Sequence, residues 1–364
     1  MFSSLKYIPS IFYKRDPLQF TFFVTSRCNA RCPFCFYWQD RTSSRDELTV
    51  KEVEKISASM KPLLWLLFSG GEIFIRKDLP ELVDAFYRNT HPVIITLPTN
   101  GFAPNLVVPA TEEILSRSPE SAVICKISVD GVGAEHDRLR NTPGSFEKAM
   151  DTYEQLRRLG ERYGNLQLGI NTVFCRENQD NMNQIIDFVN TLPGWETHTT
   201  SKVRGNPAGT AYKEVDLEKY RQAIVRLEQD LKGNNSKMYH FSLARLKTAQ
   251  DLVQRRLIYE TVRQGRRLLP CYAGRIGAVM NEVGDVFPCE ILSDKMGNLR
   301  DSGYNFPKVF FSEQADRVRA KINKTRCHCS HECYFVTNIL FNPLMYGQVA
   351  RQYLELPGRS RAGL

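Results

Sequence analysis

The sequence contains no uncharged apolar run near the ~20 residues that a membrane-spanning helix needs. Its first residues, MFSSLKYIPSIFYKRDP, lack the apolar stretch and the small-residue cleavage site of a signal peptide. Hydrophobic residues make up 42% and charged residues 24% of the 364 residues, which excludes a disordered, collagen-like or coiled-coil chain. We therefore expect a globular cytoplasmic protein whose ten cysteines bind metal rather than form disulfides.

The net charge of +9 is unevenly distributed. Residues 216–270 hold twelve Lys and Arg against six Asp and Glu, most densely at Arg255–Arg256 and Arg266–Arg267. The simplest explanation of this basic excess is a helix face exposed to solvent. The alternative is a surface that binds an anionic partner. Aromatic residues do not interleave with the basic ones as single-strand stacking would require, so a nucleic-acid partner is disfavoured.

Strands and helices are predicted to alternate through the first 205 residues, which implies a parallel sheet with right-handed crossovers. A partial barrel and an open doubly wound sheet both fit six such units, and both place ligands at the carboxyl ends of the strands. The cysteine loop, Gly70–Gly71–Glu72, Asn100, Asp130 and Arg204 fall there. The six expected strands are Leu18–Thr25, Leu63–Ser69, Val93–Thr99, Ala122–Val129, Leu166–Phe174 and His198–Arg204.

The rest of the chain has a different character. Residues 216–264 predict two helices broken near Gly233–Asn234–Asn235–Ser236, and Arg275–Met280 with Asp285–Pro288 predict a β-hairpin. We place a domain boundary near residue 265. The expected segments are an N-terminal tail (1–17), an α/β core (18–215), bridging helices (216–264), a cysteine-bearing domain (265–335) and a C-terminal tail (336–364).

Cys28, Cys32 and Cys35 follow the first expected strand with the spacing C-x3-C-x2-C. Thiolates select zinc, copper(I) or iron–sulfur clusters. A fourth nearby cysteine would close a zinc or four-iron site, but the next one is Cys125. Three ligands on a four-iron cluster leave one iron open for a substrate or cosubstrate. The alternative is a zinc loop that borrows a distant ligand.

The segment SRCNARCPFCFYW resembles the radical S-adenosylmethionine (SAM) superfamily, whose C-x3-C-x-aromatic-C motif follows the first barrel strand. Ser69–Glu72, Ser128–Gly131 and His136–Arg140 match further motifs in the same order, over about residues 18–205. The resemblance implies an α/β fold with a partial (β/α)6 barrel. It also implies a [4Fe–4S] cluster on the three cysteines, SAM as cosubstrate, a 5′-deoxyadenosyl radical that abstracts hydrogen, and an electron donor such as flavodoxin or ferredoxin.

The resemblance further assigns the SAM contacts. The adenine would lie near Phe34 and the backbone around Val203, the methionyl ammonium at Gly70, Gly71 and Glu72, and the methionyl carboxylate at Ser128 and Arg140, with Asp130 also directed toward the cofactor.

The second cysteine group resembles the twitch and SPASM extensions of the same superfamily, which carry auxiliary [4Fe–4S] clusters. Cys271 and Cys289 bracket the expected hairpin, and Cys327, Cys329 and Cys333 follow. The resemblance implies one auxiliary cluster on Cys271, Cys289 and two of the last three, without indicating which two. A zinc ribbon is the alternative, and His328 or His331 is a conceivable substitute ligand.

Two residues are candidates for catalysis. Glu290 follows Cys289 directly, where sulfatase-maturating relatives carry a catalytic aspartate, so it is a candidate general base or a residue that orders the cluster loop. Cys175, at the end of the fifth strand, is a candidate hydrogen-atom donor or an ordinary strand-end cysteine.

For the function, we expect an oxidoreductase or epimerase that acts on a small polar molecule such as a sugar, an aminoglycoside or a lipid- or nucleotide-linked sugar. A peptide or protein maturase is the alternative, disfavoured here because only 17 residues precede the first strand. A non-enzymatic iron–sulfur or zinc protein is the second alternative. The apolar residues 336–350 are expected to pack on the barrel; with Phe2, Tyr7, Ile8, Ile11 and Phe12 they could instead form a peripheral membrane patch.

Overall fold

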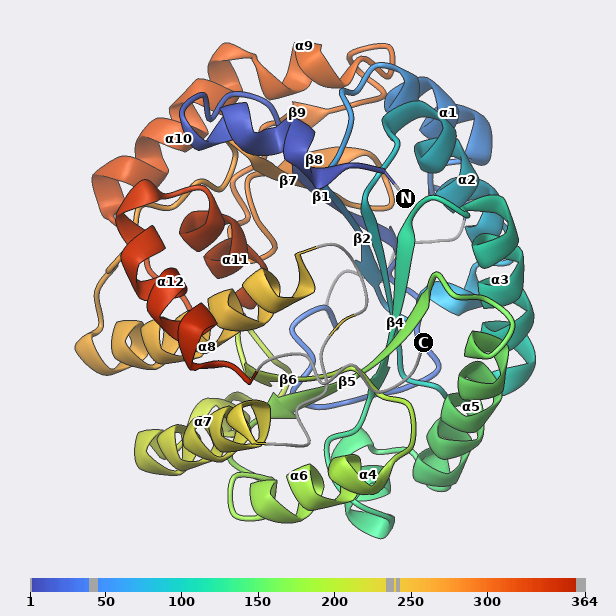
Figure 1. Ribbon diagram of the computed structural model, residues 1–364. Helices are drawn as coiled ribbons and strands as arrows, with labels where there is room; N and C mark the ends of the chain where they lie inside the picture. The colour runs from blue at the N-terminus through green and yellow to red at the C-terminus, as the bar shows by residue number, and fades with distance from the viewer. Residues whose placement is uncertain (1, 39–44, 234–238, 240–242, 358–364) are drawn as a thin grey trace.

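The computed structural model describes residues 2–38, 45–233, 239 and 243–357 (Figure 1). Its centre is one nine-stranded sheet with the order β6-β5-β4-β3-β2-β1-β7-β8-β9, in which every pair from β1 to β6 is parallel. This arrangement confirms the expected α/β class and partial barrel. The six parallel strands are β1 (Gln19–Thr25), β2 (Trp65–Gly70), β3 (Ile94–Thr99), β4 (Ala122–Ser128), β5 (Leu166–Phe174) and β6 (Thr197–Lys202).

Strands β1 to β4 are rich in apolar residues, as strands covered on both faces require, whereas β6 consists of polar residues. All seven residues of β1 are buried, and Phe22 of β1 lies in register with Phe68 of β2. The predicted strands agree with the observed ones to within two residues at every end. Helices complete the units. They are α1 (Val50–Ala58), α2 (Leu79–Thr90), α3 (Pro104–Arg117), α4 (Ala134–Arg140), α5 (Ser145–Gly160) and α6 (Met182–Thr191), of which α3 and α4 were not predicted.

The predicted hairpin is present as β7 (Gly277–Met280) and β8 (Asp285–Phe287), and β9 (Gly297–Asn298) adds a short strand that the sequence did not reveal. Strand β7 pairs in parallel with β1, where Gln19 faces Gly277, whereas β8 and β9 are antiparallel. The hairpin therefore extends the barrel sheet beyond β1. The segment boundaries proposed from the sequence stay a prediction.

The two bridging helices are α7 (Leu217–Lys232) and α8 (Ala244–Gln264). The break predicted at residues 234–236 lies outside the described residues. Helices α11 (Glu332–Leu340) and α12 (Tyr346–Glu355) both contact α8. Figure 1 shows them together on the side of the strands opposite α1, α2, α3 and α5. Helices α9 (Phe306–Phe310) and α10 (Glu313–Thr325) lie between α8 and α11 in the sequence.

The N-terminal segment packs against the C-terminal one. Tyr7, in the 3-10 helix Ser4–Ile11, is buried with Leu18, Ile276 and Phe341. Residues 336–350 thus lie against the rest of the fold, as the sequence predicted. Among the described residues, no helix is long and apolar enough to cross a membrane.

Candidate active site

A cavity of about 640 Å³ lies inside the curve of the barrel, and most of the predicted site residues line it. The carboxyl ends of the strands contribute Gly70, Ser128 and Val203, and helices α8 and α11 contribute Arg255 and Cys333. The cavity therefore joins the barrel strands to the C-terminal helices, which is where parallel α/β folds bind ligands.

The loop after β1 brings the first three cysteines to the cavity wall. Cys28 and Cys35 each accept an N–H bond from the residue two positions later, Ala30 and Tyr37, at N–Sγ distances of 3.4 Å. Burial raises the pKa of Cys32 to about 12, and the nearby Arg140 guanidinium acts against this rise. Three cysteines beside one buried cation fit a metal cluster, because a bound metal would stabilise the thiolates that burial otherwise disfavours.

Gly70 and Gly71 allow the end of β2 to approach the cysteine loop. Gly70 has a φ of +122°, and a Cβ on it would lie 2.2 Å from the Thr25 carbonyl oxygen; a Cβ on Gly71 would lie 2.0 Å from that of Arg27. Only glycine fits such an approach. The Glu72 carboxylate accepts bonds from Thr99 Oγ1 (2.9 Å) and Asn100 N–H (2.7 Å), which joins the ends of β2 and β3. Burial nevertheless raises the pKa of Glu72 to about 7.

Arg140 lies at the end of α4 and lines the cavity with Ser128. Asp130 is fully buried and pairs with it at an Nη2–Oδ2 distance of 2.7 Å. Burial acts to lower the pKa of Arg140, but the charge and hydrogen bond of Asp130, together with the nearby Cys32 and Cys28, outweigh burial and hold the pKa above its ordinary value. The cavity wall therefore carries a fixed guanidinium close to Cys28 and Cys32, a suitable partner for a carboxylate.

Phe34 and Val203 both line the cavity and pack in one small apolar cluster. Cys175 belongs to the same cluster, but it is fully buried and is not among the residues that line the cavity in the described part of the chain. Its role as a hydrogen-atom donor stays a prediction.

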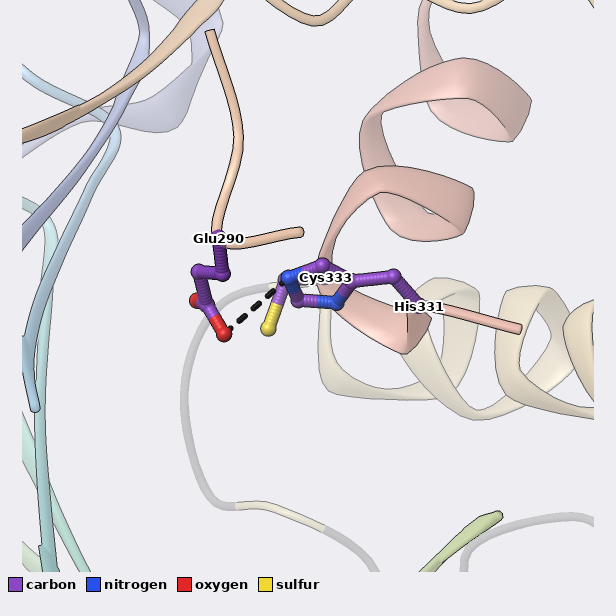
Figure 2. Close-up of side chains that lie close together, drawn as sticks. All are labelled: Glu290, His331 and Cys333. Carbon is purple, nitrogen blue, oxygen red and sulfur yellow. Dashed lines mark ion pairs between the residues drawn. The ribbon is translucent and has the colours of Figure 1, made fainter. Parts of the chain in front are cut away.

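Glu290 lies in a buried polar network at the opposite end of the chain from the first cysteine loop. Its Oε2 is 3.3 Å from Arg204 Nη2 and 3.1 Å from His331 Nε2. Arg204 also donates to Glu332 at 2.7 Å. Figure 2 shows the Glu290, His331 and Cys333 side chains directed toward one another, the last two from the start of α11.

The charges around Glu290 determine its protonation. Burial alone would raise its pKa, but His331 and Arg204 outweigh burial and lower the pKa to about 2. A carboxylate with this pKa is a weak base, so a general-base role would first require a substrate to displace one of the two cations.

Sequence reasoning missed Glu332 as a partner of Arg204, and it did not assign a role to Arg255. Arg255 Nη2 donates to the His198 carbonyl at 3.0 Å, whereas its buried Nη1 has no hydrogen-bond partner among the described residues. Lys126 lines the same cavity and donates to Thr199 Oγ1 at 2.8 Å. No short sequence motif identifies Arg255 and Lys126 as neighbours, because they lie far apart in the sequence, on α8 and β4.

Comparison with known proteins explains this arrangement. Residues 22–189 match the model of the radical SAM superfamily. The chain contains a radical SAM domain. Its matched domain contains Cys28, Cys32, Cys35 and the Gly70–Glu72 and Ser128–Arg140 segments.

Three relatives are similar to this radical SAM chain over most of its length. They are the AdoMet-dependent heme synthase of Methanosarcina barkeri (25% identity, 77% of this chain, 79% of the relative), the subtilosin biosynthesis protein AlbA of Bacillus subtilis (26%, 87% and 66%) and the mycofactocin maturase MftC of Mycolicibacterium smegmatis (26%, 86% and 76%). The solved structure of anSMEcpe with bound AdoMet has the same fold, with a TM-score of 0.60 at 16% identity over 93% of this chain and 96% of that one.

The radical SAM domain also settles the cofactors. The radical SAM enzyme uses S-adenosylmethionine and a [4Fe–4S] cluster, and its cysteine-rich C-terminal region is of the twitch/SPASM type that carries an auxiliary cluster. The expected fold, family and cofactors are therefore confirmed. The individual ligands and SAM contacts stay predictions, and so does the chemistry performed on the substrate.

Proposed function

We propose that this radical SAM enzyme modifies a peptide or protein. This proposal prefers the maturase alternative of the sequence analysis to a sugar substrate. The observation that carries the proposal is the similarity to a bacteriocin biosynthesis protein and a maturase. Each similarity covers more than four fifths of this chain and extends well beyond the matched domain at residues 22–189. It therefore includes the C-terminal half, which contributes the substrate-side wall of the cavity.

The cavity offers groups of both charges that suit a polar chain. Lys126 and Arg255 are available to carboxylate or carbonyl oxygens, and Asp251 and Glu290 line the same space for N–H donors or cations. We assign Cys28, Cys32 and Cys35 to the SAM-binding cluster and Arg140 to the SAM carboxylate. The bound cofactors supply the radical that removes hydrogen from the substrate, and the protein orients the substrate and excludes water.

The test is co-expression with short peptides encoded beside this gene, followed by mass spectrometry of each peptide. We expect a mass change in one of them that disappears when Cys28, Cys32 and Cys35 are replaced by Ala. If no neighbouring peptide changes mass, while metabolites of a deletion strain show an accumulated small molecule, the peptide proposal is wrong.

A second candidate is a carboxylated tetrapyrrole, favoured by the similarity to the heme synthase and by the cations Lys126 and Arg255 in the cavity. Porphyrins absorb strongly in the visible range. Incubation of the reduced, reconstituted enzyme with SAM and iron coproporphyrin, followed by chromatography, would reveal a new porphyrin product if this candidate is correct.

A further inference from the structure

The C-terminal region has five cysteines for a cluster that takes four, and the structure divides the five into two groups. The first group is Cys271, Cys289, Cys327 and Cys329, and the second is Cys333 alone. None of these four is among the described residues that line the central cavity, whereas Cys333 is.

Helix geometry explains the division. Residues three or four apart share one face of a helix, and neighbouring residues point about 100° apart. In α11, Cys333 and Val336 both line the cavity. Tyr334 and Asn338 lie on another face, where the Tyr334 hydroxyl donates to the Pro288 carbonyl (2.6 Å) and Asn338 bonds to Tyr272 N–H (2.8 Å). The face directed at the residues next to Cys271 and Cys289 is therefore not the face that carries Cys333.

The surroundings of Cys333 suit a substrate-facing group better than a second metal site. Donor atoms of Glu290, His331 and Cys333 lie within 4.8 Å of one another, a spacing that could hold an ion (Figure 2). However, Arg204 Nη2 lies 3.3 Å from Glu290 Oε2, and a fixed guanidinium repels a metal cation at that position. Arg204 already neutralises the negative charge of Glu290, which a metal ion would otherwise do.

We propose that Cys271, Cys289, Cys327 and Cys329 hold the auxiliary cluster, and that Cys333 is a free thiol which forms, with Glu290 and His331, the substrate-facing wall of the cavity beside that cluster. Two short connections then link the cluster to the cavity: Glu290 directly follows Cys289, and Cys333 lies four residues beyond Cys329. This assignment does not depend on whether the substrate is a peptide.

The first experiment counts iron in anaerobically reconstituted protein. Wild-type protein with two [4Fe–4S] clusters should contain about eight irons, and Cys327→Ala or Cys329→Ala about four. Cys333→Ala, the matched variant, should keep about eight. The proposal is wrong if Cys333→Ala loses about half of the iron, or if both Cys327→Ala and Cys329→Ala keep all of it.

The second experiment needs no variant and so does not depend on whether a variant folds. Iodoacetamide is added to the loaded wild-type protein without oxygen, and the modified peptides are identified by mass spectrometry. Cys333 should be modified, whereas the four ligands should react only after iron is removed by a chelator. Cys125 and Cys175, which are fully buried, serve as internal controls that the protein has stayed folded. A Cys333 that is protected until the iron is removed would overturn the assignment.

Discussion

Asp130 holds Arg140 through a single carboxylate oxygen: Oδ2 accepts from both Nε (2.8 Å) and Nη2 (2.7 Å) of the guanidinium. The other oxygen, Oδ1, accepts the N–H of Val173 at 2.7 Å. The aspartate thus attaches the end of α4 to β5 and fixes the direction of the arginine at the cavity wall. Because both charges are buried, the loss of one would leave the other without compensation.

We predict that Asp130→Asn lowers the free energy of unfolding by about 3 kcal/mol, since breaking a buried pair leaves an uncompensated charge. Arg140→Lys should keep the charge but weaken SAM binding about tenfold, because lysine cannot reproduce the guanidinium fork. Urea unfolding and calorimetric titration with SAM measure the two effects. Arg138→Lys is the control: its pair with Glu177 is exposed, and it should change stability by less than about 0.5 kcal/mol.

Gly71→Ala should displace the cysteine loop, because the new Cβ would lie 2.0 Å from the Arg27 carbonyl oxygen. We expect a loss of about 1–3 kcal/mol in stability together with weaker SAM binding. Gly164→Ala is the matched control, since a Cβ there meets no atom within 4 Å. Equal thermal stability and equal SAM affinity in the two variants would show that the close approach at Gly71 is unimportant.

Glu290→Gln removes the charge that lies between Arg204 and His331 but keeps the shape of the side chain. If Glu290 acts on the substrate, the variant should keep about eight irons and still cleave SAM without substrate, while product formation falls at least about a hundredfold. Loss of auxiliary iron would instead indicate a structural role. Glu332→Gln, which removes the other partner of Arg204, is the matched variant, and its effect on product formation should be smaller.

His198 makes the stability of the protein sensitive to acid. Burial, with the charges of Arg255 and Lys126, lowers its pKa from 6.5 to about 3. The unfolded chain therefore binds a proton that the folded protein excludes, and stability should fall by about 1.4 kcal/mol per pH unit as the pH drops below about 6.5.

His198→Gln should make this pH dependence shallower between pH 6.5 and 4.5, as urea unfolding at a series of pH values would show. The exposed His91 is the control, and His91→Asn should leave the slope unchanged. An unchanged slope in His198→Gln would mean that other groups cause the acid sensitivity.

The sequence predicted where the six barrel strands lie along the chain and that the three cysteines follow β1. It also predicted the resemblance to the radical SAM superfamily. Each depends on residues that are neighbours in the chain: apolar runs of strand length, a capping box at Thr49 and Glu52, and short motifs at strand ends. Such local patterns carry the same meaning in any chain with this alternation of strands and helices. The choice between a sugar and a peptide substrate could not be made in this way, because no short motif in the chain describes a substrate.

The tertiary structure alone decided which groups meet at the cavity. The pairing of β7 with β1 joins residues more than 250 positions apart, and Arg204 contacts Glu332 across 128 positions. It also separated Cys333 from Cys327 and Cys329, which the sequence presents as one group. The physical reason is that neighbouring residues of a helix point to different faces. Their spacing in the sequence therefore does not say which face of α11 contacts the cluster and which lines the cavity. Only the packing of α11 against the rest of the fold decides this.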